Sequence, residues 1–156
     1  MKTPTIMSLA DAKFITPALS SVTYVSDSRL LEHGQEYALA AIRDKSCSSN
    51  QVHGVTGVLI FTGKHFAQTT EGPPSAVAHL MTLLASDQRQ ANMIVIDEHE
   101  PSEREFARWS MAYQGSSVYV SRVTERSLTG LQRGDPLAVK RLLRLMHEFG
   151  ASPSIL

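Results

Sequence analysis

Apolar and polar residues alternate along the first half of the chain with two periods, one typical of strands and one typical of helices. Within residues 20–26 the period of two places Tyr24 and Ser26 on the same face of a strand. Residues 35–44 carry apolar side chains at helical spacing and predict a short amphipathic helix that ends before the polar loop 46–50. The chain therefore begins with a strand followed by a helix.

The next part of the pattern predicts a hairpin, a helix and two further strands. Residues 55–61 and 64–71 are two strand-like runs joined by Thr62-Gly63. Pro73-Pro74 marks a helix start, and an apolar helical stripe follows at Val77, Leu80, Met81 and Leu84. A short apolar strand at 93–96 and an alternating strand at 106–113 complete this part.

The order βαββαββ predicts an α+β fold of the ferredoxin-like type, with two helices on one face of a mixed sheet, because βαβ crossovers are right-handed. Beyond Gln114 a short helix at 124–131 and a second helix started by Asp135-Pro136 form a C-terminal helical appendage. The apolar stripe of the second helix should dock on the open face of the sheet or on a partner subunit. We divide the chain into a flexible leader 1–17, a ligand-binding domain 18–115 and an output or oligomerisation segment 116–156.

Composition narrows the function classes. Fifteen Lys and Arg balance fifteen Asp and Glu, so nucleic acid and membrane surfaces are poor partners. No apolar run has the roughly 18 residues that a membrane-spanning helix needs. The single cysteine, Cys47, fits a reducing compartment, and we expect a cytoplasmic protein. None of the six histidines has the spacing of a metal-ligand pair, so we expect no metal site.

Residues of several kinds that could together hold a planar ligand recur at fixed points along residues 20–113. They are Tyr24 with Ser26, Asn50, Gly54-Val55-Thr56-Gly57, Phe66 with Gln68, Glu71-Gly72, Asp87 with Arg89, and Phe106 with Trp109 and Met111. This ordered set resembles the BLUF domain family of blue-light sensors that use FAD, over about residues 20–113. The pyrimidine edge of a flavin offers acceptors and an N–H donor that suit amides such as Asn50 and Gln68.

The resemblance implies a short, non-enzymatic photoreceptor that binds FAD non-covalently, with FMN or riboflavin as alternatives, between the two helices. It implies the following cofactor-binding residues: Tyr24, Ser26, Ile42, Asn50, Gln68, Leu84, Asp87 and Arg89. Blue light would drive electron and proton transfer from Tyr24 through Gln68 to the flavin and rearrange the hydrogen bonds of Gln68. The last strand, through Trp109 or Met111, would carry the change to the C-terminal helices and on to a downstream signalling protein or a homo-oligomer.

Four positions depart from the family pattern: Ser49, Thr70, Leu83 and Gln90. Gln90 stands where a histidine commonly follows the D-x-R run in this family. This change affects how the tail of the cofactor would be bound, and Arg89 is the remaining cation that could bind the tail. Two other functions remain open from the residues alone. One is an acylphosphatase-like hydrolase using Arg29 and Asn50, which lacks a phosphate-binding loop, and the other is a ligand-free oligomerisation domain.

Overall fold

The computed structural model describes residues 17–114 and 118–151, so all of the expected leader except Pro17 lies outside the described residues. The strands and helices follow the predicted order βαββαββ and continue into two C-terminal helices. Their bounds are β1 Ser20–Ser28, α1 Gln35–Val52, β2 Thr56–Phe61, β3 His65–Gly72, α2 Pro74–Ala85, β4 Gln90–His99, β5 Trp109–Gln114, α3 Val118–Gln132 and α4 Pro136–Ala151.

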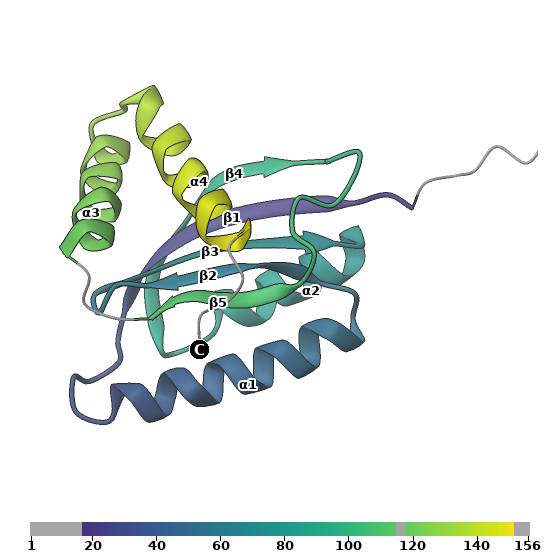
Figure 1. The fold of residues 1–156 in the computed structure, drawn as a ribbon, viewed down its shortest axis with the longest axis horizontal. Helices are drawn as coiled ribbons and strands as arrows, with labels where there is room; N and C mark the ends of the chain where they lie inside the picture. The colour runs from purple at the N-terminus through teal and green to yellow at the C-terminus, as the bar shows by residue number, and fades with distance from the viewer. Residues whose placement is uncertain (1–16, 115–117, 152–156) are drawn as a thin grey trace, which may run out of the picture.

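A five-stranded mixed sheet in the order β4-β1-β3-β2-β5 forms the centre of the fold. The β2–β5 pair is parallel and the other pairs are antiparallel. Helices α1 and α2 lie on one face of the sheet and α4 lies on the other, with α3 beside α4 (Figure 1). This arrangement confirms the predicted ferredoxin-like α+β fold with a C-terminal helical appendage.

Helix α1 is longer than predicted, because the polar stretch 46–50 is helical rather than a loop. The hydroxyl of Ser48 donates 3.1 Å hydrogen bonds to the carbonyls of Asp44 and Lys45, so this polar residue is satisfied within the helix. The helix ends just before Gly54, whose φ of 68° is a left-handed conformation that favours glycine. A breaker was needed to end the helix, and the serine-rich run contains none.

Strand β5 starts later than predicted, because residue 106 lies in the preceding loop. The carboxylate of Glu71, on β3, accepts hydrogen bonds from the backbone N–H groups of Glu105 (3.0 Å) and Phe106 (2.6 Å) and from the hydroxyl of Thr56 (2.9 Å). A backbone held by this fully buried carboxylate is not free to pair in the sheet. The same alternation that predicted a strand at Phe106 therefore serves a loop that fills the core.

The hairpin of α3 and α4 covers the open face of the sheet. This is one of the two positions predicted for the apolar stripe of the second helix. Helix α4 buries Leu142, Leu145 and Met146 in one core cluster with strand residues and Phe106. The ring of Phe106 stacks on His147 with 5.2 Å between ring centres, and it lies so close to Gly150 that a Cβ there would overlap it. Helix α3 begins at residue 118 rather than 124, and β4 is longer at both ends than the predicted 93–96.

Candidate functional site

A buried pair of polar side chains lies on the sheet face that α1 and α2 cover. The hydroxyl of Tyr24 donates a 2.6 Å hydrogen bond to Oε1 of Gln68, and the two residues are 1% and 4% exposed. They meet because β1 and β3 pair antiparallel with Tyr24 directly opposite Gln68. Burial raises the pKa of Tyr24 far above its usual value, with Asp87 acting in the same direction and Gln90 against it. Tyr24 is therefore a neutral phenol that donates to an amide.

One cavity collects this pair together with residues of α1, α2 and the segment that follows α2. Its lining is Tyr24, Ile42, Ser46, Leu59, Phe66, Gln68, Leu84, Asp87, Arg89 and Gln90. Ile42 on α1 and Leu84 on α2 provide apolar walls, whereas Gln68 provides a polar edge. Within the described residues, no hydrogen bond engages Nε2 of Gln68, whose N–H groups are free to meet an acceptor on a ligand.

An ion pair stands at the rim of the cavity. Nε and Nη2 of Arg89 donate to the carboxylate of Asp87 at distances of 2.9 Å and 2.6 Å, and the Arg89 backbone N–H adds a 3.0 Å bond. These hydrogen bonds lower the pKa of Asp87, while the bond to Asp87 raises the pKa of Arg89. The guanidinium is held in place by Asp87, so it is a fixed cation at the mouth of the cavity.

Gln90 is a member of the site that sequence reasoning treated only as a departure from a pattern. Its Oε1 accepts a 2.5 Å hydrogen bond from the hydroxyl of Ser26, and its Nε2 donates to the carbonyl of Leu84 at 2.9 Å. One amide thus joins β1 to the end of α2. Ser26 reaches the cavity through Gln90 and does not line it. Of the other lining residues, Phe66 was already singled out with Gln68 in the sequence, whereas Leu59, which lies opposite Gln68 on β2, was not and depends on the strand register.

Asn50 lies apart from the cavity lining in this structure. It is 4% exposed in the last turn of α1, and its carbonyl accepts a 2.8 Å hydrogen bond from the backbone N–H of Val55. The hydrolase alternative required Asn50 to meet Arg29. Asn50 lies near the start of β2, at the edge of the sheet where β1 begins, because Thr56 of β2 and Ser21 of β1 both pair with Glu71. Arg29 follows the last residue of β1, at the opposite edge. A strand of this length separates the two backbone positions by roughly 25 Å, which is farther than an arginine and an asparagine side chain reach together, so that site does not form.

The two candidates on the last strand occupy different rows of the sheet. Leu59 lies opposite Gln68 on one side and opposite Met111 on the other, so the Met111 backbone shares the cross-strand row of Gln68. Trp109 lies opposite Gly57, two residues earlier. It is 6% exposed and packs with Leu39, Leu59, Phe61 and Phe66, and its indole nitrogen is buried without a partner among the described residues. The Met111 side chain lies outside the described part of the chain.

The residues that line this site fit the chemistry of a flavin. Apolar side chains from two helices suit the two faces of an isoalloxazine ring, and an amide with free N–H groups suits its carbonyl edge. Arg89 suits the anionic tail. Across residues 17–114 and 118–151 no group of three or more His, Cys, Asp or Glu is placed to bind a metal, and no helix is long and apolar enough to cross a membrane.

Fold and site together define a small α+β domain whose cavity is lined by both apolar and polar side chains, and comparisons with known proteins give its family. The profile of the BLUF family, described as "Sensors of blue-light using FAD", matches residues 19–112. The chain therefore belongs to the BLUF family, whose cofactor is FAD.

Three proteins among those compared are similar to this chain. The structure of BlrB, a BLUF protein in its dark state, is 32% identical with a TM-score of 0.68, and the match covers 85% of this chain and 97% of that one. BlrP1 of Klebsiella pneumoniae, solved with FMN and cyclic diGMP, is 26% identical with a TM-score of 0.55, over 63% of this chain and 26% of that one. The photoactivated adenylate cyclase subunit beta-like protein FB of Euglena gracilis is 30% identical over 94 residues, which are 60% of this chain and 11% of that protein.

Proposed function

We propose that this chain is a non-enzymatic blue-light photoreceptor and that the Tyr24–Gln68 pair is its switch. The observation that carries the proposal is the 2.6 Å hydrogen bond between the two buried side chains, at the wall of the cavity, in a chain of the BLUF family. FAD is the expected ligand, with FMN or riboflavin as alternatives. FMN is consistent with the relative BlrP1, whose structure contains it.

The residues of the cavity would divide the binding of the flavin among them. Ile42 and Leu84 would contact the two faces of the ring, Gln68 would donate to its carbonyl edge, and Arg89 would face the tail. Asn50 would anchor the ring from the end of α1 if its side chain turned toward the cavity. The flavin would supply the absorption of blue light and, when excited, a one-electron oxidant.

The protein's part in the switch is a proton held between two stated atoms. Tyr24 keeps its proton on Oη in the dark, because burial raises its pKa, and directs it at Oε1 of Gln68. A phenol that loses an electron becomes a strong acid, so the proton would move along this hydrogen bond to the amide oxygen. The protonated amide would then rotate, or would give up a proton from Nε2 to an acceptor atom of the bound flavin, which would have received the electron. Either change alters the hydrogen-bonding groups that Gln68 presents to the cavity.

Contacts on the opposite face of the sheet support a route from Gln68 to α4. Thr69 follows Gln68, and its hydroxyl bonds to that of Thr23 at 2.8 Å and lies 3.7 Å from the sulfur of Met146 on α4. A shift of β3 at Gln68 would therefore move Thr69 and change its contact with α4. We propose that Met111, whose backbone shares the row of Gln68, is its neighbour on β5 rather than Trp109. The segment 116–156 would then signal to a partner protein or an oligomer.

The test is the absorption spectrum of the dark-purified protein before and after blue light. We expect a yellow protein whose flavin band shifts reversibly to the red, and we expect the shift to disappear in Tyr24→Phe and in Gln68→Leu. Tyr37→Phe and Gln132→Leu are matched controls, because both residues are exposed and neither lines the cavity.

Two results would contradict the proposal. A protein that stays colourless after reconstitution with FAD, FMN or riboflavin is not a photoreceptor. A normal photocycle in Tyr24→Phe or Gln68→Leu would show that the assigned pair is not the switch, even if the protein is a photoreceptor.

A further inference from the structure

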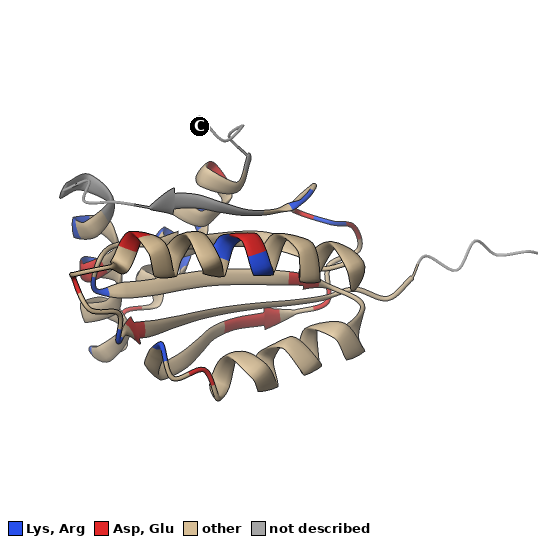
Figure 2. Cartoon of the chain, turned by 90° about the horizontal axis from the view of Figure 1, so that it is seen from below, with Lys and Arg blue, Asp and Glu red and all other residues tan. Residues whose placement is uncertain are grey.

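Charge is unevenly distributed along this neutral chain. Residues 118–151, which contain α3 and α4, carry six Lys and Arg against three Asp and Glu, whereas residues 17–114 carry seven against eleven. Several of the acidic residues lie on strands of the sheet, coloured red in Figure 2. The helical appendage is therefore the cationic part of an otherwise acidic domain.

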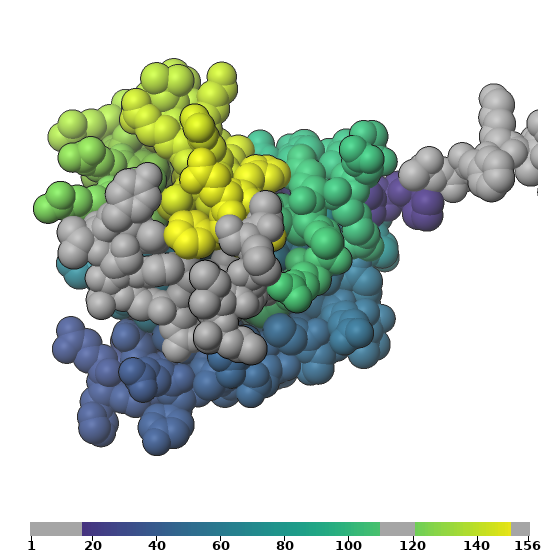
Figure 3. Space-filling view, in the orientation of Figure 1, coloured from purple at the N-terminus to yellow at the C-terminus, as the bar shows by residue number. Residues whose placement is uncertain are grey.

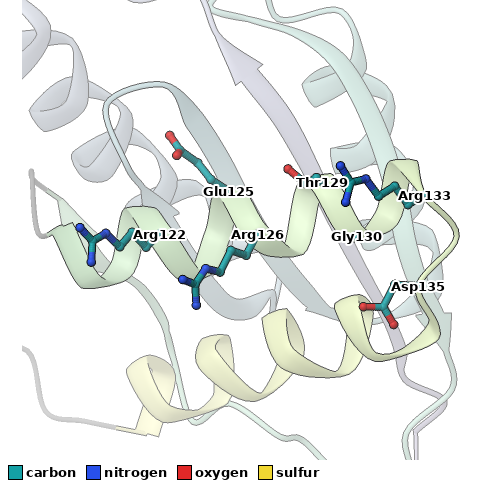
Figure 4. A pocket seen from close by; sticks show the side chains of 7 residues that line it. All are labelled: Arg122, Glu125, Arg126, Thr129, Gly130, Arg133 and Asp135. Atoms are coloured by element: carbon teal, nitrogen blue, oxygen red, sulfur yellow. The ribbon is translucent and has the colours of Figure 1, made fainter.

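Three of these cations form a stripe along α3. Arg122 and Arg126 are one turn apart and share one face of α3, which ends at Gln132. Arg133 is the next residue, and its backbone N–H still donates a 3.1 Å hydrogen bond to the carbonyl of Thr129, so it continues the row just beyond the helix end, over about 16 Å in all. We call this set the arginine stripe. All three are exposed, and they line a shallow groove together with Glu125, Thr129, Gly130 and Asp135 (Figure 4).

The acidic residues near the stripe are engaged elsewhere. Glu125 lies 3.9 Å from the ammonium of Lys64, and Asp135 lies 3.5 Å from Arg141 and accepts a 2.9 Å hydrogen bond from the backbone of Leu137. No carboxylate among the described residues forms an ion pair with an arginine of the stripe. Its three guanidinium groups are thus available to an external anion.

The position of α3 leaves the stripe open to a large partner. Helix α4 packs on the sheet and α3 packs mainly on α4, so α3 is the outer helix of the hairpin. The space-filling view shows both helices at the surface (Figure 3). Leu137, in the first turn of α4 just beyond the stripe, is 50% exposed and offers an apolar contact beside the charges.

We propose that the arginine stripe is a docking surface for an acidic helical segment of a partner protein. The proposal rests on the proposed function in treating α3 and α4 as the output of the photoreceptor, and it adds the chemistry of the partner. An acidic helix with carboxylates four and seven residues apart repeats the spacing of the stripe, so each guanidinium meets one carboxylate. A small anion reaches only one or two of the three cations.

Two other occupants fit less well. A nucleic acid extending beyond the stripe would meet the net negative charge of residues 17–114. A second copy of the chain offers no matching acidic helix, because none of the described helices carries three acidic residues. Helix α1 has Glu36 and Asp44, α3 and α4 have one acidic residue each, and α2 has none.

The experiment uses the full chain in the dark and a fluorescent alanine-based helical peptide. The peptide carries three glutamates, the second four residues after the first and the third seven residues after the second. Fluorescence anisotropy should show weak binding that decreases with salt. The variant Arg122→Gln/Arg126→Gln/Arg133→Gln should bind about tenfold more weakly, since exposed ion pairs contribute little individually. The control Arg43→Gln/Lys140→Gln/Arg144→Gln removes the same charge from exposed positions of α1 and α4 that do not line the groove, and it should bind within about twofold of the unmodified chain.

Four results would overturn the proposal. The first is equal binding of a peptide of the same composition whose glutamates are spread around the helix, and the second is an equal loss of peptide affinity in the two triple variants. The third is tighter binding of an oligonucleotide of equal charge, and the fourth is self-association of the chain that the stripe variant abolishes. The flavin spectrum is recorded on the same samples. A chain that binds the peptide but shows no light-induced shift would leave the docking surface standing and remove the proposed function.

Discussion

Replacing Glu71 with glutamine should loosen the connection between β3, the loop before β5 and α4. The Glu71 carboxylate is fully buried and accepts hydrogen bonds from Thr56 and from the backbone N–H groups of Glu105 and Phe106. In Glu71→Gln the remaining oxygen can keep the bonds to Thr56 and Phe106, because both go to Oε1. The new NH₂ group then faces the N–H of Glu105, which loses its acceptor.

The cost follows from these three bonds. A lost charge-assisted hydrogen bond with a buried N–H left unpaired costs about 3 kcal/mol, and removing a buried charge returns part of it, so we expect a net loss of about 2 kcal/mol. Glu71→Ala leaves all three donors without an acceptor and should cost about 4 kcal/mol or more. For a chain of this length, 2 kcal/mol lowers the melting temperature by about 6 °C.

The assay is urea unfolding followed by hydrogen exchange of the folded variants. Glu98→Gln is the matched control, since Glu98 is an exposed carboxylate on β4 and its loss should change stability by less than about 0.5 kcal/mol. Exchange in α4 should rise more than exchange in α1 in Glu71→Gln, because Phe106 packs on α4. The reasoning is refuted if Glu71→Gln is as stable as the control and protects α4 equally well.

Two further predictions test the backbone and the pH dependence. Gly57→Ala should prevent normal folding, because its φ is 148° and a Cβ would overlap a carbonyl oxygen of β3, whereas Gly63→Ala, with open space around it, should cost only about 1–2 kcal/mol by thermal unfolding. Burial lowers the pKa of His99, but Asp97 and Glu105 outweigh it and raise that pKa above 6.5. Protonated His99 should thus stabilise the fold below pH 6.5 and lose this effect as pH rises through the raised pKa; equal pH dependence of unfolding in His99→Ala would contradict this.

The sequence by itself determined most of the elements and their order. Local periodicity decides which side chains share a face, so Tyr24 could be assigned to a buried strand face without knowledge of the partner strand. Gln68 was singled out by the family resemblance, since an amide on a strand by itself favours an exposed position. Breakers and starters are also local, which is why the hairpin turn at Gly63 and the helix start at Pro74 were predicted correctly. The family resemblance rested on such local groups and was confirmed by the profile match.

What the tertiary structure decided depends on contacts between residues distant in sequence. The register of β1, β3, β2 and β5 places Tyr24 opposite Gln68 and puts Met111, not Trp109, in the row of Gln68. The Glu71 carboxylate moves Phe106 out of the last strand by binding its backbone. The alternation of apolar and polar residues determines which face of the sheet a side chain lies on, but not the register of its strand or the partner strand. Register and buried hydrogen bonds depend on how all the elements pack together.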